Sequence, residues 1–328
     1  MLKIELLESI KQLKKLKAKK IFLTVPEGLK TKVEEIIEEL EEKGFSVATS
    51  MDPCFGACDL KQKEAKQLSC DAILHLGHTK FLEKPIIPVV YAPLKYELGE
   101  RFERIAKILS EWLKDEKINE TGLVTTAQFL HYLPMLKEAL KKNGLSAVIG
   151  KGKRTENGQV LGCNYSSAQV MPGIIIYFGD GLFHPLGIHF ATQKKVIIAN
   201  PISLEIKMLG EEKKEFLKRR ILLIERAKEA KSYAILISTK EGQNRILEAA
   251  AIKKELEKKG KKAKLYLMDY ISNEALLGIK AEALINTACP RISIDDYLQY
   301  KIPIINLSEA DYLLGKKNYE KYELQSVY

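Results

Sequence analysis

The sequence lacks any apolar run near the roughly 20 residues that a membrane-spanning helix needs. Its first 20 residues interleave lysines with leucines, so the uninterrupted apolar core of a signal peptide is missing too. We therefore expect a cytoplasmic protein that begins with an amphipathic helix, roughly over residues 2–18. Hydrophobic residues make up 46% and charged residues 29% of the 328 positions, which is typical of a globular chain with two or three domains.

Signatures of nucleic-acid binding are also missing. The net charge is +10, but the chain has no RGG segment, no zinc-finger spacing and no basic stretch interleaved with aromatic residues. The excess of lysine indicates either a solvated basic surface or an acidic partner, and it disfavours a basic partner. We expect no direct contact with nucleic acid and none with a membrane.

Closely paired cysteines are absent as well. The five cysteines form no CxxC pair of the kind that structural zinc sites use, and an odd number in a cytoplasmic chain argues against a disulfide framework. Cys54 and Cys58 form CxxxC, but Lys61 stands where the CxxxCxxC signature of common radical S-adenosylmethionine enzymes needs a third cysteine. Any metal site must therefore combine distant residues.

A repeated unit fills much of the chain. Residues 21–44, 122–144 and 234–260 each contain a short β-type run, a polar turn and a helix-period pattern that stops at a glycine. Another β-type run follows each glycine, and the order strand, helix, strand implies parallel pairing. The terminal glycines, which suit the left-handed position after a helix, are Gly44, Gly144 and Gly260.

Each unit is preceded by an amphipathic helix and followed by further apolar strands. The pattern predicts an α/β protein of three repeated domains, each a mostly parallel four-stranded sheet flanked by helices. The proline-containing stretches at 84–100 and 200–206 are read as connections. The expected domains are residues 1–95, 96–205 and 206–328.

One cysteine falls in a loop after a strand in each unit. These are Cys58, Cys163 and Cys289, while Cys54 and Cys70 are extra cysteines of the first unit. Parallel sheets bind ligands beyond the carboxyl ends of their strands, so the three loops could meet at a shared centre. Three thiolates suit a soft metal, and a four-iron cluster accepts three cysteines with one iron left open. From the residues alone, buried packing thiols and a cluster both remain open.

Seven short motifs extend along the chain around these cysteines. They are VPEGLK (25–30), DPCFGACD (52–59), HLGH (75–78), GQVLGCN (158–164), YFGDGLFHPLG (177–187), STKEGQNR (238–245) and NTACPRISIDD (286–296). In these motifs and their order the chain resembles the diphthamide-biosynthesis enzymes that begin the modification of a histidine on translation elongation factor 2, in their archaeal, self-pairing form.

The resemblance implies an atypical radical S-adenosylmethionine enzyme, a 2-(3-amino-3-carboxypropyl)histidine synthase. Its [4Fe–4S] cluster would be held by Cys58, Cys163 and Cys289. Cys54 has no ligand role in that pattern and is expected either to pack or to lie next to the ligands, and Cys70 is expected to be structural. The implied reaction cleaves the bond between the sulfur and the γ-carbon of S-adenosylmethionine and adds the 3-amino-3-carboxypropyl radical to the histidine. It also implies elongation factor 2 as protein substrate, a homodimer and an external electron donor. The cluster itself carries the catalysis, and no protein acid or base is assigned.

Four further residues are candidates for binding S-adenosylmethionine. Arg291 follows Cys289 closely and suits the methionine carboxylate, although a surface arginine is the alternative. Gln243 is expected at a strand-to-helix turn, where it is either a ligand contact or an ordinary first-turn helix residue. Asp180 and His184 lie in a glycine-rich loop, which we expect to line the site; the alternative is a tight turn in which Asp180 caps the next helix.

The remaining histidines and the tryptophan have simpler interpretations. His75 and His78 are expected in the core or at a sheet edge more readily than at a ligand. His131 and His189 lie on helix-period patterns and are expected to be structural, and Trp112 is expected in a core or an interface.

Three other functions compete with this reading. A quinolinate-synthase-like dehydratase also takes one cysteine from each of three repeats, but uses its open iron as a Lewis acid. An electron-donating, non-catalytic subunit would need a catalytic partner, whereas all three ligand positions are present in this chain. A three-domain metabolite-binding protein with structural thiols would be colourless after anaerobic purification.

Overall fold

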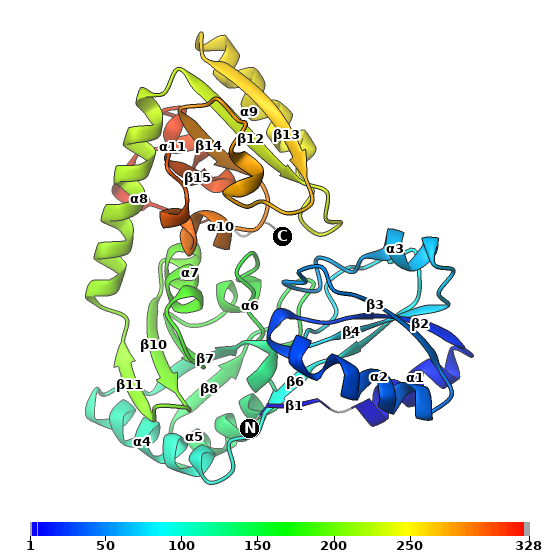
Figure 1. Ribbon diagram of the computed structural model, residues 1–328. Helices are drawn as coiled ribbons and strands as arrows, with labels where there is room; N and C mark the ends of the chain where they lie inside the picture. The colour runs from blue at the N-terminus through cyan, green and yellow to red at the C-terminus, as the bar shows by residue number, and fades with distance from the viewer. Residues whose placement is uncertain (1, 5, 325–328) are drawn as a thin grey trace.

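Three lobes, each built on its own sheet, make up the computed structural model (Figure 1). The structure describes residues 2–4 and 6–324, and within them the strands form three large sheets and one two-stranded ribbon. The expected first and third domains also include residues 1, 5 and 325–328, which lie outside the described residues. The predicted α/β architecture with mostly parallel sheets is confirmed.

The first large sheet is wholly parallel. Its lobe contains β1 (Leu2–Ile4), α1 (Leu6–Lys15), β2 (Lys20–Thr24), α2 (Val33–Glu42), β3 (Ser46–Ser50), α3 (Gln62–Gln67), β4 (Ala72–Leu76), β5 (Val89–Ala92) and β6 (Leu94–Tyr96). The strand order is β3-β2-β4-β5, with α1 and α2 packed on one face and α3 on the other. The helix expected over 2–18 is shorter, because β1 precedes it and pairs with β6 as an antiparallel ribbon.

The second sheet has one strand more than expected. Its lobe contains α4 (Arg101–Asp115), β7 (Glu120–Thr125), α5 (Tyr132–Lys142), β8 (Ser146–Ile149), α6 (Ser166–Gln169), β9 (Ile174–Phe178), α7 (Phe183–Thr192), β10 (Lys195–Asn200) and β11 (Glu205–Met208). The order is β11-β10-β9-β7-β8, and β11 runs antiparallel to β10. The stretch read as a connection folds back because the Asn200 side chain accepts N–H bonds from Ile202 and Ser203, and Leu204 adopts a left-handed backbone.

The third sheet is again wholly parallel. Its lobe contains α8 (Glu211–Glu229), β12 (Ser232–Ser238), α9 (Ile246–Lys258), β13 (Lys262–Met268), β14 (Ala283–Asn286), α10 (Arg291–Ile294), β15 (Ile304–Asn306) and α11 (Ala310–Leu313). The order is β13-β12-β14-β15. Both faces of the sheet are covered by apolar cores. One core also encloses an ion pair, in which the Nε of Arg220 donates to Glu309 at 2.8 Å.

Local signals read from the sequence reappear in the lobes. Gly44, Gly144 and Gly260 follow α2, α5 and α9 with φ angles of +89°, +77° and +73°, the left-handed conformation that glycine adopts without strain. Trp112 packs against the core of the second lobe, as expected. Among the helices of residues 2–4 and 6–324, none is both long and apolar enough to cross a bilayer.

Matching strand orders relate the three lobes. The orders β3-β2-β4-β5, β8-β7-β9-β10 and β13-β12-β14-β15 place the second and third strands of each repeat in the same positions. Because parallel strands end at one edge, the loops after them share that edge in each lobe. Figure 1 shows α6, α7 and α10, which lie among these loops, near the centre where the lobes face one another. The boundaries near 95 and 205 stay a prediction.

Candidate functional site

The three cysteines singled out in the sequence lie in loops at the carboxyl edges of three different sheets. Cys58 lies between β3 and α3, and Cys163 lies between the equivalent strand β8 and α6. Cys289 instead follows β14, an inner strand of its sheet, directly before α10. All three are partly buried and unpaired by disulfides. The centre therefore has one thiol per lobe, but not exact threefold equivalence.

The thiols are close enough to influence one another electrostatically. Burial, and then the charge of Cys289, raises the pKa of the Cys58 thiol to about 12. Burial also raises the pKa of Cys163, with further contributions from Cys58 and Cys289. Burial raises the pKa of Cys289 against the opposing charge of Arg291. Three buried thiols close to one another resist ionisation. A bound metal reverses this because it coordinates the deprotonated thiolate.

Cys58 is held by the third lobe as well as by its own. The amide Nε2 of Gln243 donates to Cys58 Sγ at 3.2 Å, and the backbone N–H of Gly242 donates to the Cys58 carbonyl at 2.9 Å. A Cβ at position 242 would lie 2.5 Å from the Cys58 Cβ, so only glycine fits this approach. Gln243 precedes α9, which begins at Ile246, so it is a loop residue at a thiol and not a first-turn helix residue.

A charge network that is buried except for the half-exposed Asp269 lies beside Cys58, and sequence reasoning missed it. The Nζ of Lys240 lies 2.9 Å from a carboxylate oxygen of Asp59 and 2.9 Å from one of Asp269. Lys61 reaches Asp269 at 3.2 Å with its side chain only 3% exposed. Asp59 and Lys61 flank the Cys58 motif, whereas Lys240 and Asp269 follow strands of the third sheet. Their position after strands was the only available signal, since charged loop residues are usually solvated.

The charge network joins the first and third lobes. Despite burial, which acts in the other direction, the ion pair with Lys240 lowers the pKa of Asp269 to about 2. Burial raises the pKa of Asp59 against the charges of Lys240 and Lys61. Buried ion pairs fix geometry because removing one partner strands the other. The network therefore fixes the register between the loop of Cys58 and the loop of Gln243.

A cavity of about 510 Å³ opens beside Cys289. Its volume lies within the range of small-molecule sites. The lining includes Gln243, Cys289 and Arg291 from the third lobe and Phe55 from the first. Phe55 stacks on Tyr270, which also lines the cavity, with ring centroids 6.0 Å apart. Two of the four predicted substrate residues, Gln243 and Arg291, are thus brought together with a cysteine.

Arg291 is oriented from two sides. Its Nε donates to the Asp295 carboxylate at 2.7 Å, and its guanidinium carbon lies 4.8 Å from the ring centroid of Phe183 in the second lobe. The stacking is a cation–π contact that leaves the rest of the guanidinium fork available for hydrogen bonds. A carboxylate ligand in the cavity could therefore compete with Asp295 for this arginine.

Asp180 and His184 lie in the second lobe, and neither is among the described residues that line this cavity. Asp180 is exposed, and its carbonyl accepts the hydroxyl of Tyr177 at 3.2 Å. The alternative role of Asp180 as a helix cap is wrong. The N-cap residue of α7 is Leu182, and no side chain forms a capping hydrogen bond to this helix. Burial, and then the charge of Arg291, lowers the pKa of His184 to about 4, so His184 lies within electrostatic reach of the cavity.

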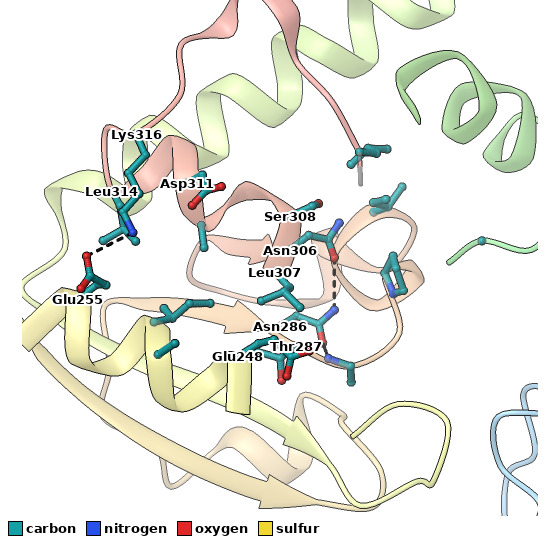
Figure 2. Close-up of a pocket in the computed structure, with 18 of the residues that line it drawn as sticks. Glu248, Glu255, Asn286, Thr287, Asn306, Leu307, Ser308, Asp311, Leu314 and Lys316 are labelled. Carbon is teal, nitrogen blue, oxygen red and sulfur yellow. Dashed lines mark hydrogen bonds and ion pairs between the residues drawn. The ribbon is translucent and has the colours of Figure 1, made fainter. Parts of the chain in front are cut away.

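A second cavity, of about 400 Å³, is lined mostly by residues of the third lobe (Figure 2). Its wall includes Gly162 and Pro290, which adjoin Cys163 and Cys289 in the chain. Figure 2 shows Glu255 pointing to Lys316. The Nζ of Lys316 lies 3.2 Å from a carboxylate oxygen of Glu255. Lys316, which lines the cavity, thus neutralises one of the acidic groups of the cavity wall. Neither Cys163 nor Cys289 belongs to the lining, so we assign this cavity no role in binding.

The other cysteines occupy packed positions. Cys54 is 3% exposed, its Sγ lies 3.7 Å from the Asp59 carbonyl, and burial raises the pKa of its thiol to about 11. Cys70 packs in an apolar core of the first lobe. These environments suit the packing roles expected for both.

Three of the other histidines make internal hydrogen bonds. His75 is fully buried, with Nδ1 2.6 Å from the hydroxyl of Thr24 and Nε2 3.0 Å from Nδ1 of His78. Burial lowers the pKa of His78 to about 4, and it also lowers the pKa of His75 well below its ordinary value. His189 Nδ1 contacts the Lys194 carbonyl at 2.8 Å. These hydrogen bonds agree with the core and structural positions expected for these histidines.

The three thiols fit the donor set of an iron–sulfur cluster. Within residues 2–4 and 6–324, no group of three or more histidine, cysteine or acidic side chains could hold a single metal ion. Three cysteine thiolates are a donor set that a four-iron cluster accepts with one iron left open. Within the described residues, the side chain that hydrogen-bonds to Cys58 Sγ is the amide of Gln243, an N–H donor of the type that stabilises cluster thiolates.

Comparisons with known proteins give a consistent answer over nearly the whole chain. A family model described as "Putative diphthamide synthesis protein" matches residues 25–323. A 2-(3-amino-3-carboxypropyl)histidine synthase of Pyrococcus horikoshii is 36% identical, with 98% of this chain and 92% of that protein covered. A protein of the same name from Methanocaldococcus jannaschii is 32% identical, with 94% and 87% covered.

Solved structures show the same fold. The crystal structure of Dph2 from Pyrococcus horikoshii with a 4Fe-4S cluster superimposes with a TM-score of 0.91 at 34% sequence identity. The superposition covers 100% of this chain and 95% of that one. A second crystal structure of the same protein gives a TM-score of 0.89.

Proposed function

Because the chain belongs to the diphthamide synthesis protein family, we propose that it transfers the 3-amino-3-carboxypropyl group of S-adenosylmethionine to a histidine of translation elongation factor 2. The transfer is the first step of diphthamide synthesis, and the chain is a transferase. The observation that carries the proposal is the convergence of one thiol from each lobe, Cys58, Cys163 and Cys289, beside a cavity of suitable size. A quinolinate-synthase-like dehydratase is not supported by this family membership.

The three thiolates would hold a [4Fe–4S] cluster and leave one iron open toward the substrate. When bound, the cluster supplies the electron for a radical cleavage of the bond between sulfur and the methionine γ-carbon. The chain's own residues bind and orient the substrate and exclude water. No side chain of the described site is assigned as acid or base.

The cavity beside Cys289 would take S-adenosylmethionine. Arg291 is the partner for the methionine carboxylate, because its guanidinium can exchange Asp295 for a ligand carboxylate. Gln243 uses one N–H on Cys58 and keeps its amide oxygen for the methionine ammonium group. Asp180 and His184 would contribute from the second lobe, on the side where His184 senses the charge of Arg291.

The partners follow from the reaction. Elongation factor 2 is the protein substrate, an external donor supplies electrons, and two copies of the chain form a homodimer. The protein works in the cytoplasm, where its substrate takes part in translation. Because all three proposed ligands are present in one chain, each copy is self-sufficient and does not act only as an electron-donating subunit.

Single alanine substitutions test the ligand set. After anaerobic reconstitution with iron and sulfide, Cys58→Ala, Cys163→Ala and Cys289→Ala should each lose the intact cluster, measured as iron per chain and as visible absorbance. Cys54→Ala and Cys70→Ala are matched controls that should keep it. The ligand assignment is wrong if a control loses the cluster while one of the three keeps it.

Transfer itself is tested with dithionite, elongation factor 2 and S-adenosylmethionine labelled in the aminocarboxypropyl group. The expected result is labelled elongation factor 2 together with methylthioadenosine. If the reconstituted wild-type protein gives neither product, the proposed function fails.

A further inference from the structure

The contact between Gln243 and Cys58 is unusual because it crosses between lobes to reach a sulfur. The Nε2 of Gln243 lies 3.2 Å from Cys58 Sγ, within the distance expected for a hydrogen bond to sulfur. Gln243 is only 9% exposed, so water does not compete strongly for this N–H group. Glutamine carries no charge and cannot replace a cysteine as a soft ligand.

Several contacts hold Gln243 in this position. The adjacent Gly242 donates its N–H to the Cys58 carbonyl, and the backbone N–H of Gln243 donates to the Lys240 carbonyl at 3.0 Å. Lys240 is in turn anchored by ion pairs with Asp59 and Asp269. The loop therefore holds the Gln243 amide in a fixed orientation, because Gly242 is hydrogen-bonded to Cys58 and Lys240 is paired with Asp59 and Asp269.

We propose that Gln243 is a positioning residue that stabilises the Cys58 thiolate and sets the reduction potential of the cluster bound there. The proposal rests on the proposed function, because it requires Cys58 to be a cluster ligand. The N–H dipole points at the sulfur and favours the more negative, reduced state of the cluster over the oxidised state. Gln243 also lines the proposed substrate cavity, so the substrate would contact the same side chain.

The hydrogen bond should have a measurable effect on reduction. A hydrogen bond to a charged group is stronger than one between neutral groups, and only part of its strength differs between two states of one cluster. We therefore expect that loss of the bond lowers the ratio of reduced to oxidised cluster about tenfold at fixed potential, which equals about 59 mV for a one-electron couple.

The test is an anaerobic redox titration of the reconstituted full chain, followed by EPR of the reduced cluster without S-adenosylmethionine. Gln243→Leu should shift the midpoint to a more negative potential at unchanged iron content. Gln299→Leu is the matched control, because Gln299 lines the same cavity and is exposed, with its amide on Asp296 at 3.4 Å. Its midpoint should equal that of the wild-type protein.

A second measurement uses only the wild-type protein, so it does not depend on whether a variant keeps its cluster. In wild-type protein labelled with ¹⁵N in the glutamine side-chain amides, pulsed EPR of the reduced cluster should detect coupling to one such nitrogen. An unchanged midpoint in Gln243→Leu, or no ¹⁵N coupling in the wild-type protein, overturns the inference. If the wild-type chain forms no cluster at all, the proposed function fails first, so the two failures are distinguishable.

Discussion

Replacement of Gly242 by alanine tests whether the first and third lobes meet where the structure places them. The φ angle of Gly242 lies outside the left-handed region, so alanine can adopt the backbone conformation. The added Cβ would lie 2.5 Å from the Cβ and 2.6 Å from the Cα of Cys58. One of these contacts is with backbone, so rotation of a side chain cannot relieve the clash. The substitution therefore acts on the contact between the lobes.

The cost has two parts. Overpacking of a tight contact costs about 1–3 kcal/mol. Separating the loops also loses the hydrogen bond of 2.9 Å from the Gly242 N–H to the Cys58 carbonyl, worth about 0.5–1.5 kcal/mol. The sum of about 1.5–4.5 kcal/mol corresponds to a roughly 10- to 2000-fold shift toward the open arrangement of the lobes.

Hydrogen exchange measures this shift directly. Protection of the amide at position 242 should fall by that factor in Gly242→Ala, and iron content after reconstitution should fall with it. Amides inside β12, which are bonded within the third sheet, should keep their protection. Gly278→Ala is the matched control, because a Cβ there would meet no atom within 4 Å. Unchanged protection at position 242 would refute the assigned contact between the lobes.

Two further predictions concern the substrate cavity and the buried histidines. Arg291→Gln should weaken binding of S-adenosylmethionine to the reconstituted protein about 10- to 100-fold, because a charged hydrogen bond is lost, whereas Asp295→Asn should not weaken it; equal dissociation constants for Arg291→Gln and wild type would contradict this role. His78 is neutral in the folded chain down to about pH 4 but gains a proton near pH 6.5 when unfolded, so its share of stability is complete above pH 6.5 and is lost as the pH falls toward 4. The urea midpoint should therefore fall less between about pH 7 and about pH 5 in His78→Gln than in the wild-type protein, and an identical fall would count against the buried pairing with His75.

Local chemistry in the sequence was sufficient for the repeated architecture. Hydrophobic periods of two and 3.6 residues distinguish strands from helices, and glycines such as Gly144 mark helix ends because they tolerate a positive φ. The strand β11 escaped prediction because it is only four residues long, follows a proline-containing turn and lies at the edge of its sheet. Edge pairing depends on a neighbour that is already in place, and a short sequence window does not contain that neighbour.

The site divides in the same way. The sequence alone determined that Cys58, Cys163 and Cys289 fall one to a repeat, each in a loop after a strand, because strand ends and loop residues are set by nearby residues. Tertiary structure alone decided that Gln243 bonds to Cys58 and that Lys240 pairs with Asp59, since these partners lie 185 and 181 positions apart in the chain. Contacts of that range arise only when whole lobes pack, and packing is a property of surfaces rather than of local pattern.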